Sequence, residues 1–336
     1  MRPQSKSDRG RGGRGIVCLI LGVLILVPVI APTYIVHIAV FVFIDTLPVI
    51  GLGILSGYAG RVSLAQGALF GLGAYTTALL TTRLGIPSFA GFVPAILVAS
   101  IAGVILGAPA LRLAGLYFVM ATIGIQQIIW IILMNWIPVT GGPQGVRSIP
   151  GLGIGAMAAE SPQAYYYIAL VLALISYLLS RRVLASRLGL QLRALSDDEL
   201  AASASAVSVV RAKVIALALS AAWAGAGGFL YAHYVRYIHP DMFTLEPSIL
   251  FLTMSIFGGY RSLEGMLIAT AILESATEYL RPLGEYRLIG YGLVLLLGMM
   301  YFPKGILSLF RRRGPAAEGE DTTPTNARTD QVPLVR

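Results

Sequence analysis

Long apolar runs recur along the chain from Ile16 to Phe302 and occupy most of its 336 residues. A helix needs roughly 20 consecutive apolar residues to cross the hydrocarbon core of a bilayer. Only 12% of the residues are charged, whereas soluble domains carry about a quarter. Because so few charges cannot cover a water-exposed globule, the sequence predicts an all-α, polytopic integral membrane protein. It leaves no room for a large soluble catalytic domain.

The apolar runs predict about ten transmembrane helices. We expect the first run to be retained as a helix, because no small-residue cleavage site follows it. The eighth run is short for a full crossing, and we expect it to begin at Phe243 or to be broken. The expected spans are Ile16–Val36, Ile38–Leu55, Leu64–Thr82, Phe89–Pro109, Gly115–Trp136, Ala164–Ser180, Val214–Tyr234, Pro247–Gly259, Leu263–Leu280 and Tyr286–Phe302.

Basic residues predict the orientation of these spans. With ten spans and a cytoplasmic N-terminus, 20 of the 25 Lys and Arg residues fall in cytoplasmic segments and 5 fall outside. Lys and Arg gather on the cytoplasmic side of membrane proteins, so we expect both termini there. The expected organisation is a basic tail over 1–15, a transmembrane domain over 16–310 with a cytoplasmic loop at about 183–213, and a disordered tail over 311–336.

The sequence contains no constellation of catalytic or metal-binding residues. The three histidines have no metal-ligand spacing, and the one cysteine lies within the first apolar run. There is no G-x-x-x-x-G-K-[ST] phosphate loop, so this chain is not expected to hydrolyse nucleotide. We predict a non-catalytic protein without cofactor, metal or nucleic-acid partner.

A few carboxylates fall within the expected spans. Asp45 lies in the second span, and Glu274 and Glu278 lie in the ninth. Charged groups within a membrane are costly and are candidates for a functional site by default. For Asp45 we favour pairing between helices over contact with a substrate, and for Glu278 we favour pairing near the outer surface.

The long cytoplasmic loop, Arg181–Lys213, is predicted to be helical. Ser196 can cap a helix whose first turn carries Asp197, Asp198 and Glu199, where the helix dipole favours negative charge. Ser208 can cap the helix that enters the membrane next. The loop is either a solvated connector or a docking helix for a cytoplasmic partner, and we favour docking.

Two cytoplasmic turns resemble each other. Gly57-Tyr58-Ala59-Gly60-Arg61 leads into the third span, and Gly259-Tyr260-Arg261-Ser262 leads into the ninth. Both turns place Gly, Tyr and Arg before a Ser-Leu pair. The match is short enough to arise by chance, and it also fits a transporter built from internal repeats.

Seven blocks of sequence, in order, resemble the LivM-type permeases of branched-chain amino acid ABC importers. The resemblance runs from about Gly51 to Leu309. The blocks are Gly57–Leu64 with Phe70–Tyr75, Leu111–Phe118, Thr140–Gly145, Asp198–Ala202, Gly227–Ala232, Gly258–Gly265 and Phe302–Leu307.

This resemblance implies a heteromeric importer of branched-chain or other small amino acids. A homologous second permease would share the pathway, two cytoplasmic ATPases would drive it, and an extracytoplasmic binding protein would deliver the substrate. The resemblance implies that the stretch from Asp198 to Ala206, with Ala201 and Ala202, is the helix that contacts an ATPase. It also implies that Thr140, Gly141, Gly142 and Pro143 lie on the outer face, near the binding protein.

The chain departs from that family at three positions. Ala206 stands where Gly is usual, Gln127 replaces a common acidic residue, and Asp45 lies in a span that is usually neutral. We therefore keep Asp45, Gln127 and Glu274 as candidate pathway residues. Alternatives for the function are a permease of the same family for urea or amides, and an ion-coupled secondary transporter that uses Asp45.

Overall fold

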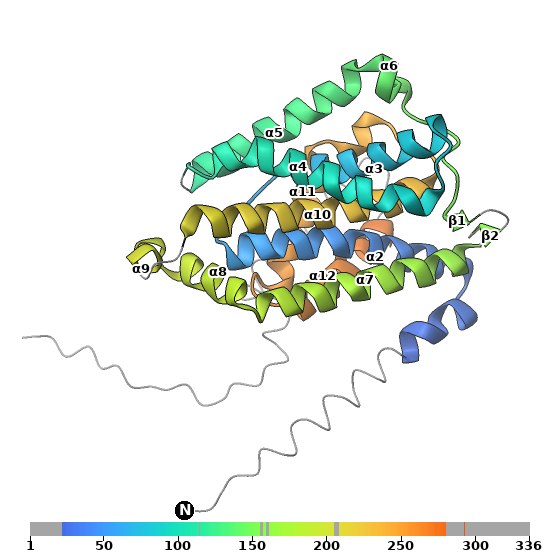
Figure 1. The fold of residues 1–336 in the computed structure, drawn as a ribbon. Helices are drawn as coiled ribbons and strands as arrows, with labels where there is room; N and C mark the ends of the chain where they lie inside the picture. The colour runs from blue at the N-terminus through green and yellow to red at the C-terminus, as the bar shows by residue number, and fades with distance from the viewer. Residues whose placement is uncertain are drawn as a thin grey trace, which may run out of the picture.

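A computed structural model describes residues 22–113, 115–154, 157–158, 161–204, 208–279 and 292. These residues form a bundle of long helices that run along a common direction (Figure 1). The elements are a helix over 22–30, α2 (Thr33–Gly53), η1 (Ile54–Tyr58), α3 (Gln66–Arg83), η2 (Ser88–Gly91), α4 (Phe92–Ala110), α5 (Leu116–Asn135), α6 (Ile137–Thr140), η3 (Gly142–Gln144), β1 (Gly153–Ile154), β2 (Met157–Ala158), α7 (Pro162–Leu184), α8 (Arg187–Asp197), α9 (Glu199–Ala204), α10 (Val209–Val235), η4 (Pro240–Phe243), α11 (Leu245–Gly258) and α12 (Leu263–Tyr279).

Five of these helices are long and apolar enough to cross a membrane. They cover Thr33–Tyr58, Ser88–Ala110, Leu116–Asn135, Pro162–Leu184 and Val209–Val235. The all-α fold class is confirmed, since the only strands among the described residues are two strands of two residues each, which pair in one hairpin. The count of ten spans stays a prediction. The expected tenth span and both tails lie outside the described residues, as does Ala206.

The boundary between the first two spans differs from the prediction. We expected the break near His37, but the helix over 22–30 ends at Ile30 and α2 begins at Thr33. Pro32 explains the position, because proline disfavours helical geometry in the residue before it and lacks an N–H to continue the hydrogen-bond ladder. The second span is correspondingly longer, and it ends in a π-helical turn over Ile54–Tyr58.

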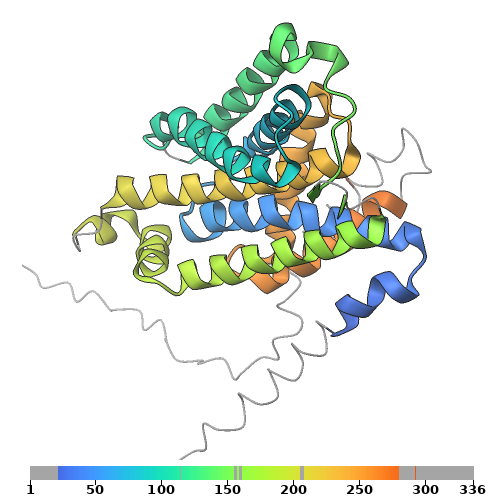
Figure 2. The same ribbon diagram turned by 45° about the vertical axis from the view of Figure 1, so that its right-hand side comes forward.

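Helix α10 lies at the centre of the bundle, in contact with α2, α3 and α4 (Figure 2). Its glycines permit this close packing. A Cβ atom on Gly228 would lie 2.0 Å from the Phe70 carbonyl oxygen of α3, and one on Gly225 would lie 2.7 Å from the Ala95 carbonyl oxygen of α4. Small residues let helix backbones approach closely where lipid supplies no hydrophobic drive. The glycines of α10 therefore act as packing residues.

The segment between α10 and α11 turns back into the bundle without forming a long helix. Ile238 exchanges two backbone hydrogen bonds with Val146, and Phe243 is buried. Helix α11 then begins at Leu245 and has only 14 residues. Irregular backbone at membrane depth is tolerated where protein buries it and pairs its polar groups. The expected shortness of the eighth span is confirmed, with the break lying before Leu245.

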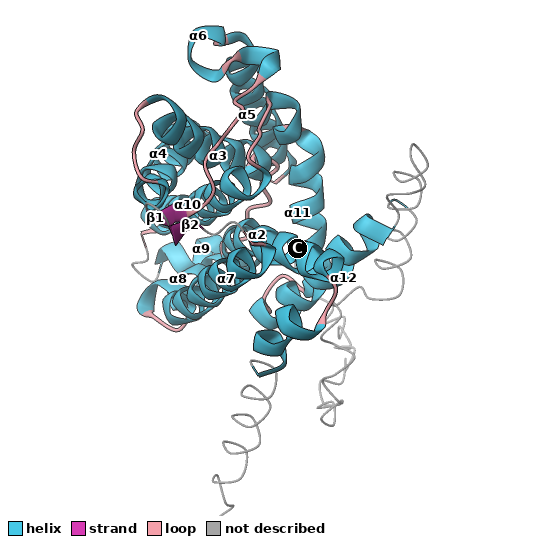
Figure 3. Ribbon diagram, turned by 90° about the vertical axis from the view of Figure 1, so that its right-hand side faces the viewer, coloured by secondary structure: helices cyan, strands magenta, loops and turns pink. Residues whose placement is uncertain are grey.

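The two ends of the bundle carry different structures. Helices α8 and α9 lie at one end, and α6 and the β1–β2 hairpin lie at the other. Figure 3 looks along the helices from the hairpin end and shows α2, α4, α7 and α10 nearly end-on.

Candidate functional site

Helices α8 and α9 meet in a sharp bend, and we call this pair of helices, residues 187–204, the elbow. Asp198 separates them with an extended backbone conformation. Its Oδ1 atom accepts hydrogen bonds from the backbone N–H groups of Leu200 (2.8 Å) and Ala201 (3.1 Å). These N–H groups have no partner within α9, so Asp198 is the N-cap of that helix.

The predicted cap is therefore wrong. We expected Ser196 to cap a helix with Asp197 in its first turn, but Asp197 is the last residue of α8. Ser196 and Asp197 instead face Arg261, whose Nη2 atom lies 2.9 Å from Ser196 Oγ and 2.6 Å from Asp197 Oδ1. The side chains of Ser196 and Asp197 are thus engaged with Arg261, and Asp198 caps α9. Ser208 does precede α10 as expected, but its side chain makes no capping hydrogen bond.

Glu199, the third acidic residue of the elbow, joins two basic groups of the bundle. Glu199 Oε1 lies 2.6 Å from Lys213 Nζ on α10, and Oε2 lies 3.2 Å from Arg61 Nη2. The Lys213 side chain is 4% exposed, whereas that of Glu199 is 49% exposed. The hydrogen bond from Lys213 holds the pKa of Glu199 below its ordinary value. A buried ammonium group requires such a partner, so Glu199 fixes α9 to the start of α10.

The two similar turns of the sequence contact each other beneath the elbow. The Tyr58 hydroxyl donates to the Arg261 carbonyl (2.8 Å), and Arg261 Nε donates to the Gly57 carbonyl (3.3 Å). A Cβ atom on Gly57 would lie 1.4 Å from the Tyr260 carbonyl oxygen, so only glycine fits there. The arginines of the two turns, Arg61 and Arg261, therefore bind two acidic residues of one elbow, Glu199 and Asp197 respectively. Sequence comparison of the turns gave no sign of this contact.

The exposed side of α9 carries an apolar residue. Leu200 is 82% exposed, while Ala202 is buried. Ala201, Ser203 and Ala204 are also exposed. Helix α9 thus presents Leu200 and small residues to the outside, beside exposed carboxylates of which Asp197 and Glu199 are paired with bases.

Asp45 and Glu274, two of the candidate pathway residues, lie together. Asp45 is buried on α2, and its carboxyl lies close to that of Glu274 on α12. Pairing between helices, the interpretation that we favoured for Asp45, agrees with this contact.

The third candidate, Gln127, is exposed on α5, and its neighbour Gln126 is the buried residue that the sequence interpretation missed. Gln126 Oε1 accepts from the Ala68 N–H (2.7 Å) and from Ser248 Oγ (3.0 Å), and Nε2 donates to the Phe243 carbonyl (2.6 Å). Gln126 falls on the buried face of α5, together with Phe118, Thr122, Ile129 and Leu133, whereas Gln127 does not.

The expected outer loop lies at the end opposite the elbow. The Thr140 hydroxyl donates to the Leu133 carbonyl (2.6 Å) and ties the loop to α5. Gly141 and Gly142 have φ values of 78° and 55°, in the region that favours glycine. Pro143 is exposed. The loop is thus a defined surface that a partner could contact.

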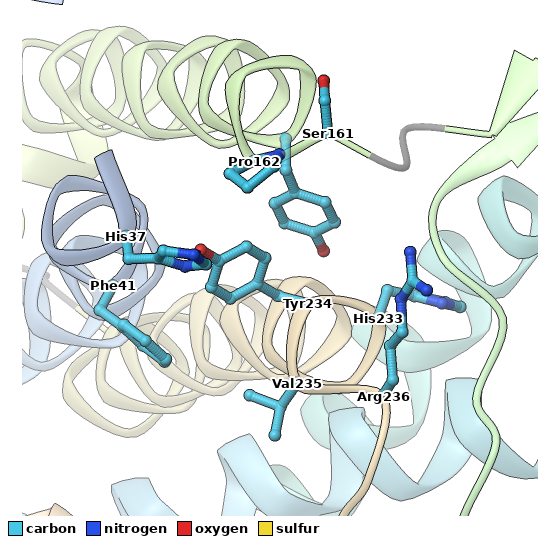
Figure 4. Close-up of a pocket in the computed structure, with 9 residues that line it drawn as sticks. His37, Phe41, Ser161, Pro162, His233, Tyr234, Val235 and Arg236 are labelled. Atoms are coloured by element: carbon cyan, nitrogen blue, oxygen red, sulfur yellow. The ribbon is translucent and has the colours of Figure 1, made fainter. Parts of the chain in front are cut away.

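A cavity of about 360 Å³ opens at the same end, between α2, α7 and α10. Figure 4 shows His37 and Tyr234 pointing toward each other across it, and these two side chains form a hydrogen bond. Arg236 lies at its rim with a left-handed backbone conformation that ends α10. Within the described ranges, no group of three or more potential metal ligands is present.

Comparisons with known proteins identify the family. The family model described as "Branched-chain amino acid transport system / permease component" matches residues 34–303. The chain is 32% identical over 312 residues to the "High-affinity branched-chain amino acid transport system permease protein LivM" of Escherichia coli K12, covering 85% of this chain and 73% of that protein. It is 31% identical to the LivM protein of Salmonella typhimurium LT2 over 82% of this chain and 70% of that protein.

The chain is also similar, at lower identity, to a second type of permease. The chain is 27% identical to the LivH permease of Escherichia coli K12, over 77% of this chain and 89% of that protein. No solved structure matches the chain. The apolar helices and the family model together establish a multi-pass protein of the cell membrane. The chain belongs to the branched-chain amino acid transport permease family and is of the LivM type.

Proposed function

We propose that this chain is the transmembrane permease subunit of an ATP-driven importer, and that it moves branched-chain or other small amino acids into the cell. The observation that carries the proposal is the elbow. It projects a short helix from one end of a membrane bundle, ties Glu199 to the bundle by ion pairs and leaves Leu200 exposed. Such a surface is suited to contact a separate motor protein.

The distribution of basic residues supports a cytoplasmic elbow. Basic residues favour the cytoplasmic side of membrane proteins, and those described gather at the elbow end. The elbow end holds Arg61, Arg112, Arg181, Arg182, Arg187, Arg193, Arg211, Lys213 and Arg261, and the opposite end holds Arg83, Arg147 and Arg236. In this orientation both termini are cytoplasmic, and Thr140–Pro143 face the outside.

The contacts of the elbow suggest how it couples to transport. Two cytoplasmic ATPases would close on ATP and displace α9. The ion pair between Glu199 and Lys213 would pass this movement to α10, and the pair between Asp197 and Arg261 would pass it to α11 and α12. The chain itself performs no chemical step. A binding protein would deliver the substrate near Thr140–Pro143, and a homologous permease would complete the pathway, as the LivM and LivH pair of relatives suggests.

The test replaces the exposed residue of α9. Leu200→Asp places a charge on the surface that would contact the ATPase, and the side chain has no packing role to lose. We expect substrate uptake to fall at least tenfold at an unchanged level of folded protein, and Leu200→Met to retain uptake. Normal uptake by Leu200→Asp, measured in cells that depend on this transporter, would refute docking through α9.

The substrate class follows from the named relatives, which are branched-chain amino acid permeases. Competition of unlabelled leucine, an aliphatic amide and urea against labelled leucine uptake tests this assignment. We expect leucine alone to compete at low concentration. If the amide or urea competes more strongly than leucine, that compound is the substrate and the assignment to branched-chain amino acids is wrong.

The neighbouring carboxyl groups of Asp45 and Glu274 favour a second candidate, an ion-coupled secondary transporter, because carboxylates within a membrane are candidates for an ion pathway. The energy source separates the two candidates. If the chain belongs to an ATP-driven importer, uptake should stop when the ATPases are deleted. Uptake that survives this deletion and collapses with the proton gradient would favour the second candidate.

A further inference from the structure

A large groove opens beside the elbow, at the level where α4 ends and α10 begins. Its volume is about 1090 Å³. Ile105 and Ala108 of α4 form one wall, and Val209 and Val210 of α10 form the other. Ile105 and Val210 are both mostly exposed. A groove with exposed aliphatic walls requires an apolar occupant, because leaving it in water would be unfavourable.

The rim of this groove is basic. Arg61, Arg112 and Lys213 line it, together with the one carboxylate of Glu199. Glu199 is shared between Arg61 and Lys213, so the lining keeps an excess of two positive charges. The Arg112 side chain is exposed and has no acidic partner in the described part of the chain. The rim therefore favours an anion.

The apolar wall continues along the membrane-spanning length of α4. Val93, Leu97, Ile101 and Ile105 follow one another at intervals of four residues and are 52–65% exposed. Residues four apart lie on one face of a helix, so they form a single stripe that ends in the groove. A cytoplasmic protein could reach the rim but not the upper part of this stripe. An acyl chain can follow all of it.

We propose that this groove binds an anionic phospholipid of the leaflet on the elbow side. The phosphate lies between Arg112 and the bases that bind Glu199, Arg61 and Lys213, and an acyl chain runs along the stripe of α4. Basic residues beside apolar helix surfaces recognise anionic lipid headgroups in this way. The lipid contacts the residues that hold α9, so its binding stabilises the resting position of the elbow.

The test measures lipid retention by the purified full-length chain. Phosphatidylglycerol and phosphatidylcholine with identical acyl chains are added in detergent, and bound lipid is counted by native mass spectrometry. We expect preferential retention of phosphatidylglycerol. Arg112→Gln should lower its affinity roughly fivefold, which corresponds to about 1 kcal/mol for one basic contact.

Arg182→Gln is the matched control, because Arg182 is exposed at the same end of the bundle but lies outside the groove. It should retain phosphatidylglycerol like the unaltered chain. Ala108→Trp, which fills the groove while leaving every charge in place, should lower retention of the lipid. Equal retention of both lipids, or unchanged affinity in Arg112→Gln, would overturn the proposal.

The assembled transporter provides the last arm of the test. Phosphatidylglycerol with a photoreactive acyl chain should label α4 between Ile101 and Ala108 in the complex. Labelling in the isolated chain that disappears in the complex would show that a partner protein covers the groove, and would overturn the assignment to lipid. Binding is measured without ATP or substrate, so its failure is distinct from failure of the proposed transport function.

Discussion

The elbow and the buried interior of the bundle are held by different kinds of polar contact. At the elbow, acidic residues pair with Arg61, Lys213 and Arg261, and most of these side chains reach water. Around the start of α3, neutral side chains make the contacts, with Gln126 and Ser248 satisfying the first N–H groups of that helix. Charges are expensive inside a membrane, whereas a neutral amide can satisfy backbone groups there.

This difference indicates which region moves. The interior contacts pair backbone groups that have no other partner, so breaking them leaves buried donors and acceptors unsatisfied. Each elbow ion pair has a carboxylate that is about half-exposed, so water can take over part of the contact at modest free-energy cost. We therefore expect the interior to remain rigid while the elbow shifts during coupling, and three predictions test this contrast.

The largest effect is expected in the interior. Gln126→Leu removes the partners of the Ala68 N–H and the Phe243 carbonyl, and should lower the free energy of unfolding by about 2–4 kcal/mol. Gln127→Leu, one residue along the same helix but exposed, should change it by less than about 0.5 kcal/mol. Thermal unfolding of both variants in detergent measures the difference. Equal destabilisation would mean that Gln126 has no special role.

A smaller effect is expected at the elbow. Glu199→Gln leaves the buried Lys213 ammonium without a charged partner and should reduce stability by about 1–2 kcal/mol, below the value for a fully buried pair because Glu199 is half-exposed. Uptake should fall more than stability does. In the double variant Glu199→Gln with Lys213→Met, stability should recover in part, since both charges are gone. A double variant less stable than either single variant argues against the pair.

The smallest effect concerns pH. The folded-state pKa of Glu199 is lowered from its ordinary value of 4.5 by the hydrogen bond from Lys213. A carboxyl of this kind adds stability above its unfolded-state pKa and loses it as the pH falls through the folded-state pKa. The stability difference between the unaltered chain and Glu199→Gln should therefore be constant above about pH 5.5 and shrink below pH 4.5. A difference that grows on acidification would contradict the assignment.

The sequence predicted the helices well because apolar run length is set by the thickness of the bilayer. It predicted the elbow as a helical loop but not its cap, because Ser196 instead contacts Arg261, 65 residues away in the chain, and a contact of that range is not visible in the sequence. It selected Gln127 rather than Gln126 because residue type alone does not tell which side of α5 is buried. Contacts between distant segments decide both points.

Thiol labelling of the elbow tests most directly whether α9 faces the cytoplasm. In a Cys18→Ser background, single cysteines replace Ser203 on α9 and Gln144 at the opposite end, both exposed. A membrane-impermeant maleimide is applied to intact spheroplasts and then to permeabilised ones. We expect Gln144→Cys to react in both and Ser203→Cys to react only after permeabilisation. Reaction of Ser203→Cys in intact spheroplasts would place the elbow outside the cell and remove the basis for its coupling to an ATPase.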